Sequence, residues 1–227
     1  MAIRPLFIPW PKEKTVITEN LQFKWHPGFA VTQKQKSIKS LHDQATSQGY
    51  ADVLEVSRKS KNKLGRDLSA FNLKIKIGST DRFITVEAAF QGSKVFESGG
   101  PYRDIFGVEG NKAKRDPRLR DSGKLIKFSF NDKDWPLEPK TLFYDWLYLQ
   151  ALKQNPDLSY QLLKFDAFTD IEFNPKKSFN CQARSCALFK SLWVCGNLNE
   201  CLKDINHYTA LMCRHQAPQQ KKLFADE

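Results

Sequence analysis

The stretch 85–96, which reads TVEAAFQGSKVF, carries an acid and a primary amine at a spacing that suits joint chemistry. Val86 and Phe90 recur at a helix-compatible interval and would bury one face. Glu87 and Lys94 are seven residues apart, about two turns of an α-helix, so the pattern predicts that they share a second face. A carboxylate and an amine on one stripe can act on one small substrate. The alternative, on spacing alone, is a solvated helix face without chemistry.

The neighbouring segments give these two residues a family context. Residues 65–72 read GRDLSAFN and precede the stretch. A Ser-x-Phe turn, then Thr-x-Glu, then aromatic-Gln-x-x-Lys is the order found in the NADAR family, the YbiA-like N-glycosidases, which the chain resembles over residues 53–195. Downstream, Trp135 introduces a helix expected over 139–153. The family pattern departs at two positions, with Ala70 in place of the usual Asn and Ala88 in place of a frequent His.

The front of the chain narrows the resemblance to a subgroup. Residues 23–30 read FKWHPGFA and residues 34–38 read KQKSI, and the whole chain looks most like the NADAR proteins encoded beside DarT-type toxins. The resemblance implies an α+β fold, mainly helical, with short strands and an N-terminal extension. It divides the chain into an extension (1–50) packed on the main body, a NADAR domain (51–215) and a flexible tail (216–227).

The resemblance also implies an activity and its partners. The expected function is an ADP-ribosyl hydrolase, an N-glycosidase that removes ADP-ribose from modified guanine bases in DNA or RNA. Such an enzyme would be the antitoxin to a DarT-like ADP-ribosyltransferase, with that toxin as a partner. The resemblance calls for no metal, cofactor or membrane.

Breaking an N-glycosidic bond builds positive charge on the ribose carbon, and this chemistry assigns roles. Glu87 would stabilise that charge or act as a general base, and Asp170 would be the second acid. In the family reading, Lys94 attacks the ribose carbon and forms a Schiff base after ring opening, which requires a neutral amine and hence a lowered pKa. The expected substrate-binding residues are Arg58, Gly65, Arg66, Ser69, Phe71, Phe90, Gln91, Trp135, Phe173 and Asn180.

Each of these assignments has a structural alternative. The aromatic side chains can stack on a purine, but aromatics of this kind are more often core residues. Asp170 lies between aromatic residues, where burial would raise its pKa, yet a capping or salt-bridged Asp fits as well. Asn180 is expected to N-cap the last core helix. His42 is interpreted as a surface or capping residue.

The formal net charge of +11 indicates an anionic partner, because clustered Lys and Arg gain from releasing counterions from phosphates. The charge gathers in two runs, 57–66 and 112–120. Either run is a phosphate-binding surface or a solvated loop. In the family reading, the first lies beside the pyrophosphate of ADP-ribose or the nucleic acid strand.

The apolar runs and the cysteines indicate the cellular compartment of the protein. No apolar run approaches the length of about 20 residues that spans a bilayer, and prolines interrupt the first residues where a signal peptide needs a continuous apolar segment. We therefore expect a cytoplasmic protein. The five cysteines all lie in the last quarter without a Cys-x-x-Cys pair, which favours reduced thiols over a zinc site.

The pattern of apolar residues predicts the remaining elements coarsely. The expected elements are an extended arm or edge strand within 1–30, a helix over 33–42, strands over 52–56 and 125–130, a hairpin of 68–77 with 82–86, and a helix over 158–165.

Two other functions stay open at this stage. The first is a small-molecule N-glycosidase acting on a phosphoribosylated riboflavin-pathway intermediate, although a metabolite needs fewer phosphate contacts than the two basic runs provide. The second is a non-catalytic nucleic-acid-binding protein in which the Glu/Lys pair is structural.

Overall fold

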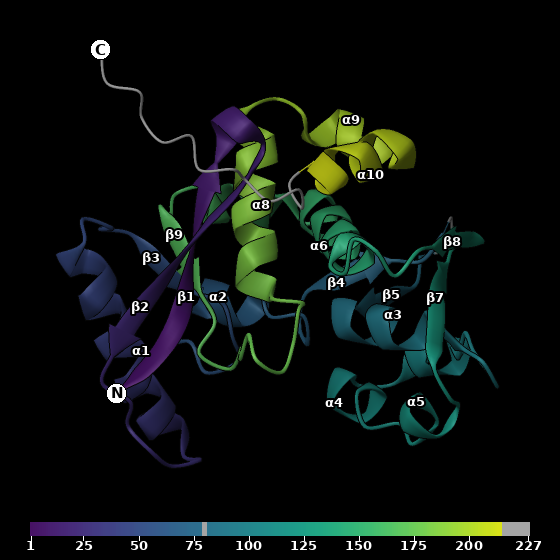
Figure 1. Ribbon diagram of the computed structural model, residues 1–227, viewed down its shortest axis with the longest axis horizontal. Coiled ribbons are helices and arrows are strands. Elements are labelled where there is room, and N and C mark those ends of the chain that lie inside the picture. Colours follow the sequence, from purple (N-terminus) through teal and green to yellow (C-terminus); the bar gives the residue numbers. More distant parts are fainter. Residues whose placement is uncertain (79–80, 215–227) are drawn as a thin grey trace.

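The N-terminal segment forms part of the largest sheet (Figure 1). The structure, a computed structural model, describes residues 1–78 and 81–214. Strands β1 (Ala2–Trp10) and β2 (Thr15–Phe23) form an antiparallel hairpin through the short 3-10 turn η1 (Pro11–Glu13). β1 also pairs antiparallel with β9 (Ala167–Thr169), which runs parallel to β3 (Val53–Glu55). The arm expected at the front therefore supplies an edge strand, β2, and an interior strand, β1.

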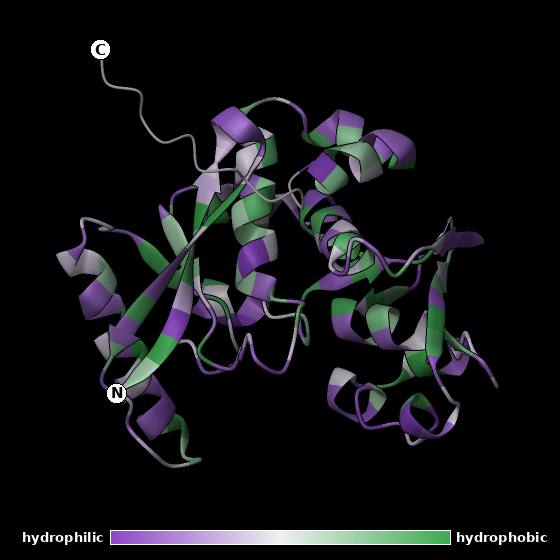
Figure 2. Cartoon of the chain, viewed as in Figure 1, coloured by the Kyte–Doolittle hydropathy of each residue, from purple (hydrophilic) through white to green (hydrophobic). Residues whose placement is uncertain are grey.

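Successive residues of a strand point to opposite faces of the sheet, and a helix covers each face of this one. Leu6 of β1 is fully buried in one apolar cluster with Leu41 of α1 (Val31–Ser47). The next residue, Phe7, belongs to the larger cluster that includes the apolar residues of α8 (Gln182–Val194). Figure 2 shows hydrophobic residues along the interior strand β1 and a hydrophilic stretch in the edge strand β2. The sheet thereby fixes where β3 and β9 end, and both ends matter for the site.

The other half of the molecule is built around α6 (Leu142–Gln154) and α3 (Val86–Gly92). Strands β4 (Lys74–Lys76) and β5 (Phe83–Thr85) form an antiparallel hairpin that leads directly into α3. A second antiparallel sheet has the order β6-β7-β8. Its strands are β6 (Lys94–Phe96), β7 (Leu125–Phe130) and β8 (Lys133–Trp135). The remaining elements of the described chain are α2 (Lys63–Asp67), η2 (Arg103–Gly107), α4 (Gly110–Ala113), α5 (Arg118–Asp121), α7 (Pro156–Leu162), α9 (Leu198–Lys203) and α10 (Ile205–Arg214).

An aromatic cluster joins α6 to α3 and the second sheet. The Phe143 ring of α6 stacks on Phe128 at 4.8 Å between centroids and lies 5.5 Å from Trp135. Phe90 of α3 completes the group, 5.2 Å from Phe128. Rings at such distances combine large apolar burial with favourable edge and offset contacts. α3 is therefore held firmly at the centre of this half.

The α+β class predicted from the sequence is confirmed, and most predicted elements are present. The strand at 125–130 is as expected, and the hairpin before α3 is present, but its first strand, β4, is shorter than the predicted 68–77. α1 is longer than the helix predicted at 33–42. The helix predicted over 85–96 is wrong at its end, because α3 stops at Gly92. The predicted tail 216–227 lies outside the described residues. Within those residues, no helix has both the length and the apolar character to cross a membrane.

Candidate active site

α3 places Glu87 in a buried first turn. The Thr85 side chain caps the helix by accepting a hydrogen bond from the Ala88 N–H at 3.2 Å. Glu87 is 6% exposed and accepts a hydrogen bond from Gln91 Nε2 at 2.9 Å, one helical turn further on. A carboxylate so near a helix N-terminus is favoured by the helix dipole. The residue is thus held in one orientation by its own helix.

Lys94 reaches the same place from a strand, which corrects the predicted geometry. Gly92 ends α3, and Ser93 closes the turn as its Oγ donates to the Ala89 carbonyl at 2.6 Å. Lys94 is the first residue of β6 and pairs with Phe128 of β7. Its Nζ lies 5.0 Å from the centroid of the Phe90 ring. Lys94 and Glu87 nevertheless line one cavity, so their convergence comes from a helix-to-strand turn rather than from two turns of one helix.

The surroundings of Lys94 favour a neutral amine. Burial lowers the pKa of Lys94, the Glu87 carboxylate opposes that shift, and the Lys114 ammonium adds to it. A lysine with a lowered pKa has more of the unprotonated form that attacks carbon.

Asp170 lies directly after β9, on the opposite side of the cavity. One of its oxygens, Oδ1, accepts hydrogen bonds from the backbone N–H groups of Glu172 (2.9 Å) and Phe173 (3.2 Å). Burial raises the pKa of Asp170 well above its usual range, and the charge of Glu55 raises it further. The bonded N–H groups belong to a turn and not to a helix, so the helix-capping role expected as one alternative is wrong, and the raised pKa is the alternative that the structure supports. A carboxyl in this state holds a proton that it can donate.

Glu55 is a second buried acid behind Asp170, and the sequence gave no sign of its importance. It is 2% exposed and accepts hydrogen bonds from Thr169 Oγ1 (2.7 Å) and the Ile171 N–H (2.9 Å). Burial raises its pKa to about 7. His42 Nε2 lies 2.9 Å from the same Thr169 hydroxyl, and burial lowers the pKa of His42 to about 4. The surface role expected for His42 is therefore wrong, because its ring belongs to this buried network.

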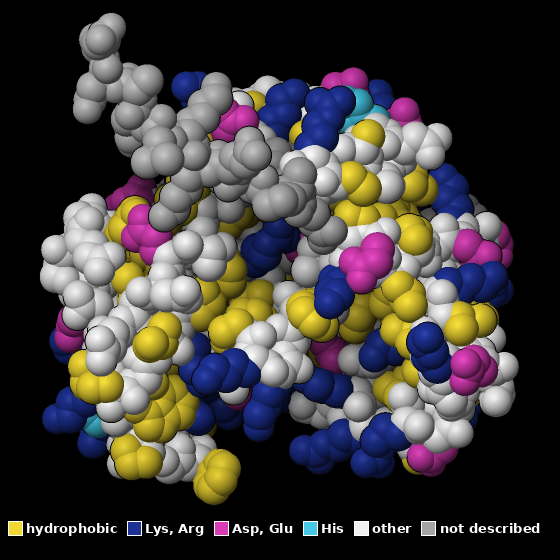
Figure 3. Space-filling model, in the orientation of Figure 1, with side chains coloured by type: hydrophobic (Ala, Val, Ile, Leu, Met, Phe, Trp, Pro, Cys, Tyr) yellow, Lys and Arg dark blue, Asp and Glu magenta, His cyan; other side chains and the backbone are white. Residues whose placement is uncertain are grey.

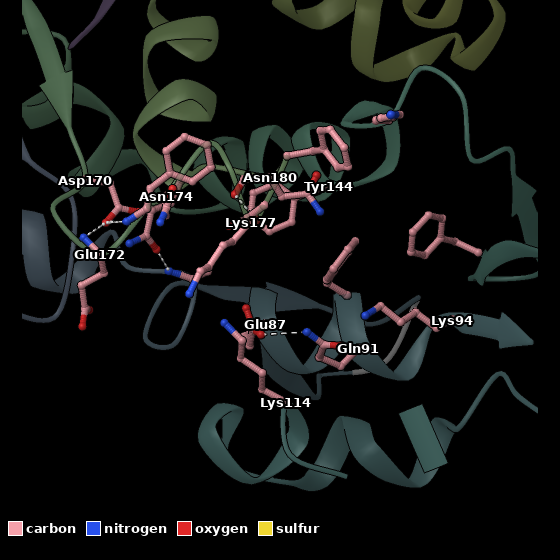
Figure 4. Close-up of a pocket in the computed structure, with 18 of the residues that line it drawn as sticks. Glu87, Gln91, Lys94, Lys114, Tyr144, Asp170, Glu172, Asn174, Lys177 and Asn180 are labelled. Carbon is pink, nitrogen blue, oxygen red and sulfur yellow. Dashed lines mark hydrogen bonds between the residues drawn. The ribbon is translucent and has the colours of Figure 1, made fainter. Parts of the chain in front are cut away.

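A cavity of about 750 Å³ lies between these two groups of residues (Figure 4). Glu87, Gln91 and Lys94 line one side, and the segment after β9 lines the other. Eight of the thirteen residues predicted for the site line it, namely Glu87, Lys94, Asp170, Phe71, Phe90, Gln91, Phe173 and Asn180. The volume falls within the range of pockets that enclose organic ligands.

Two amide side chains in the cavity have unused acceptors. Gln91 is 5% exposed, and its Oε1 has no hydrogen-bond partner among the described residues. The same holds for Asn180 Oδ1. The predicted N-cap role of Asn180 is wrong, because Cys181 occupies the N-cap position of α8 and makes no side-chain cap. A buried polar atom without a partner costs free energy unless a ligand or solvent satisfies it, so both amides are suited to ligand contact.

Several cavity residues were missed from the sequence. Lys114, Tyr144, Lys177 and Gln182 all line the cavity. Lys114 lies in the second basic run, so its charge was visible, but its position beside α3 depends on tertiary packing. α4 comes this close because Gly110 has no side chain, and a Cβ there would lie 3.1 Å from the Phe71 ring and 3.4 Å from Glu87 Cβ.

Five predicted substrate-binding residues do not line the cavity. Each is held by packing or hydrogen bonds elsewhere in the structure. Trp135 is buried in the core at 1% exposure. A Cβ on Gly65 would lie 2.0 Å from the Glu55 carbonyl, so this glycine serves packing. Arg66 Nη1 donates to the carbonyls of Ser60 and Lys61, both at 2.8 Å, and so folds the basic loop back on itself.

The last two lie directly behind cavity residues. The Arg58 guanidinium lies 4.2 Å from the centroid of the Phe71 ring and donates to Asn111 Oδ1 at 2.8 Å. Ser69 is fully buried, and its Oγ lies 3.3 Å from Gln182 Oε1. Gln182 also accepts from the Ala70 N–H and donates to the Val56 carbonyl, at 2.8 and 2.6 Å. These bonds tie the segment before Phe71 to α8 and β3.

Metal ligands are not gathered at the site. Within residues 1–78 and 81–214, no group of three or more His, Cys, Asp or Glu side chains is placed to hold a metal ion. The five cysteines are free thiols, and three of them, Cys181, Cys186 and Cys201, are buried. Burial raises the pKa of Cys181 well above its usual range, so this thiol stays protonated beside the site.

The sequence of nearly the whole chain matches one protein family. The sequence matches, over residues 2–222, the profile of a family described as the DarT1-associated NADAR antitoxin. Because the match spans nearly the whole chain, the protein belongs to this family. NADAR proteins are in general hydrolases of N-glycosidic bonds. No curated protein matches the sequence significantly.

Proposed function

We propose that the protein is an ADP-ribosyl hydrolase that removes ADP-ribose from modified guanine bases in nucleic acid, and so acts as the antitoxin to a DarT-like transferase. The observation that carries the proposal is the convergence, in one cavity, of Glu87, an amine of lowered pKa at Lys94 and a carboxyl of raised pKa at Asp170. These are the groups that cleavage of a glycosidic bond by amine attack requires.

The first bond change occurs at the anomeric carbon of the ribose. The neutral amine of Lys94 attacks this carbon, and the bond to the guanine nitrogen breaks with its electron pair moving to that nitrogen. Asp170 supplies the proton that the departing base takes up. Glu87 stabilises the positive charge that develops on the sugar.

The covalent intermediate is then resolved without a cofactor. The nitrogen of Lys94 carries a positive charge after the attack, and it first gives up a proton to the Glu87 carboxylate. Its lone pair then forms a C=N bond as the ribose ring opens, and Glu87 passes the proton to the ring oxygen, which becomes a hydroxyl group. Water adds to the resulting Schiff base, and loss of the amine regenerates Lys94 and releases ADP-ribose. Glu87 is placed to accept the proton of that water as a general base.

Cavity cations support a substrate with a pyrophosphate. Lys114, Lys140 and Lys177 line the cavity in addition to Lys94. Lys140 Nζ lies 4.1 Å from the centroid of the Phe179 ring, so a cation and an aromatic face occur together there. Phosphate oxygens bind ammonium groups, and a purine can stack on the exposed aromatic rings. Figure 3 shows further Lys and Arg side chains along the lower part of the same face, around a hollow.

The competing enzymatic function is hydrolysis of a phosphoribosylated riboflavin-pathway intermediate. The deciding experiment measures turnover of both substrates by the full chain: an oligonucleotide with one ADP-ribosylated guanine, and the phosphoribosylated metabolite. We expect release of ADP-ribose from the oligonucleotide, with a KM that rises steeply with salt. Turnover of the metabolite alone would reject the proposal.

A non-catalytic role would be revealed by the same assay. In that case the protein would bind the modified oligonucleotide and leave it intact at every enzyme concentration. The proposal also names the cognate DarT-like toxin as the functional partner, because the hydrolase acts on the product of that enzyme.

A further inference from the structure

The segment between β2 and α1 presents a large aromatic side chain to solvent. Phe29 is 100% exposed. Burying a phenylalanine side chain stabilises a protein by about 1.5–3 kcal/mol, so full exposure forgoes that gain. Figure 1 shows this segment projecting at the lower edge of the molecule, before the start of α1.

This segment is anchored to α1. The Lys24 N–H donates to Ser40 Oγ at 3.1 Å, and the His26 N–H donates to Ser37 Oγ at 2.9 Å. Gly28 turns the chain with a φ of +122°, a conformation that favours glycine. Phe29 is therefore displayed at a defined position, which suits recognition of a partner.

The sequence of this segment and of the first part of α1 is basic, although Asp43 pairs with one of its lysines, Lys39. Residues 20–42 contain no Asp or Glu and include four lysines. Lys34 Nζ lies 4.4 Å, and the Arg4 guanidinium carbon 5.4 Å, from the centroid of the Trp25 ring. Aromatic rings interleaved with cations are typical of surfaces that bind single-stranded nucleic acid.

A continuous set of contacts joins this segment to the cavity. Gln35, in the second turn of α1, donates from Nε2 to the Lys59 carbonyl at 3.4 Å. The next residue back, Arg58, packs on the Phe71 ring, which lines the cavity. Residues 56–66 also contain no acidic side chain. A basic path therefore runs from Phe71 to the start of α1.

We propose that Phe29, with Lys34 and Lys59, forms a platform for the nucleotides that flank the modified base, with Phe29 stacking on an unpaired base. This inference rests on the proposed function, since it assumes a nucleic acid substrate. A base joined to ADP-ribose enters the cavity only when it is out of a base stack, which leaves its neighbours free to stack elsewhere. The net positive charge favours a polyanion over a protein as the occupant of this surface.

The experiment compares Phe29→Ala with Phe83→Ala, a matched control at a residue that is 53% exposed on β5. Binding of an unmodified single-stranded oligonucleotide is measured by fluorescence anisotropy. Stacking is worth about 1–3 kcal/mol per base, so we expect Phe29→Ala to weaken binding about 5- to 150-fold and Phe83→Ala to leave it unchanged. Turnover of a single ADP-ribosylated guanosine stays unchanged in both variants.

The contribution of Lys34 and Lys59 is tested by the salt dependence of oligonucleotide binding. A Lys34→Gln, Lys59→Gln double variant reduces the slope of log K against log salt by about 1.4 if both lysines contact phosphates of a single strand. An unchanged slope would overturn the assignment of the lysines.

Other outcomes reject the platform without touching the proposed function. Equal oligonucleotide binding by the wild type and Phe29→Ala would reject the platform. It would also be rejected if Phe29→Ala lost binding to the cognate toxin and kept oligonucleotide binding, which would make this surface a protein-docking site. Because the oligonucleotide is unmodified, its binding is measured independently of hydrolysis. Failure of hydrolysis with the binding differences intact would reject only the enzymatic proposal.

Discussion

The two sides of the cavity hold their carboxyl groups in opposite electrostatic surroundings. Glu87 shares its side with the amine of Lys94, and the two side chains attract each other. Asp170 has a second acid, Glu55, behind it, and the charge of Glu55 raises the pKa of Asp170 beyond the effect of burial. A carboxyl beside an amine is suited to carry negative charge, and a carboxyl beside another acid is suited to keep a proton. The division of labour in the proposed reaction follows from this difference.

Charges further out reinforce the contrast. On the acid side, the charge of Glu172 raises the pKa of both Glu55 and Asp170. The Arg4 guanidinium, which contacts the Trp25 ring, interacts electrostatically with Asp170. On the amine side, Lys114 adds positive charge near Lys94. Lys94 therefore has a second cation nearby, and Asp170 has two further acids nearby.

The largest expected effect concerns the amine. If Lys94 forms a Schiff base, borohydride added during turnover reduces the C=N bond and leaves ADP-ribose covalently attached to Lys94, as peptide mass spectrometry would detect. Lys94→Arg should give no adduct, because arginine is not deprotonated in proteins. Lys114→Ala is the matched control and should still be labelled. An adduct on Lys114 in the wild type would move the nucleophile to the other lysine.

The next effect concerns the proton on Asp170. Asp170→Asn should lower kcat about 10²- to 10⁴-fold, the usual contribution of a general acid. In the wild type, activity should fall as pH rises through the raised pKa of Asp170, because the donor form is then lost. Glu172→Gln, a change to another acid of the cavity lining, should keep this limb of the pH profile but move it to lower pH, because the charge of Glu172 raises the pKa of Asp170. A wild-type profile without a basic limb would count against Asp170 as the donor.

A smaller effect is expected on stability, from Glu55. Its pKa is about 7 in the folded chain and near 4.5 when unfolded, so the folded state binds the proton more tightly. The stabilisation is complete below pH 4.5 and is lost as pH rises through 7. Glu55→Gln keeps a neutral side chain at every pH, so its Tm should exceed that of the wild type at pH 8 and match it near pH 5.

The control for this measurement is Glu13→Gln, a change to an exposed acid. It should leave the pH dependence of Tm unaltered. If the Tm difference between the wild type and Glu55→Gln were the same at pH 5 and pH 8, ionisation of Glu55 would cost no stability. The contrast between the two sides of the cavity would then lose its basis.

The same contrast explains what the sequence could predict. Glu87, Gln91 and Lys94 lie within one short stretch, so a local motif identified them as neighbours. The motif nevertheless misassigned the element of Lys94. Gly92 is a poor helix former, and pairing with β7 extends the chain from Lys94 onward. Residues that converge through a turn cannot be found from helical periodicity.

The acid side depends on contacts between distant parts of the chain. Glu55 and Thr169 are partners across the parallel pair β3–β9, and no local pattern indicates that register. Trp135 and Asn180 show that residue type alone does not predict the role of a side chain. Each was singled out by its residue type, but burial in β8 took Trp135 away from the cavity, and the true N-cap at Cys181 left the side chain of Asn180 facing it.

The central claim is that Glu87 and Lys94 act together on one substrate, and single-turnover release of ADP-ribose from a modified guanine oligonucleotide tests it most directly. We expect Glu87→Gln and Lys94→Ala to fold, as circular dichroism would verify, and each to lose at least about 10²-fold in rate. The double variant should be little slower than the slower single variant, because residues that act as a unit are not additive. Wild-type release by either folded single variant would contradict the account.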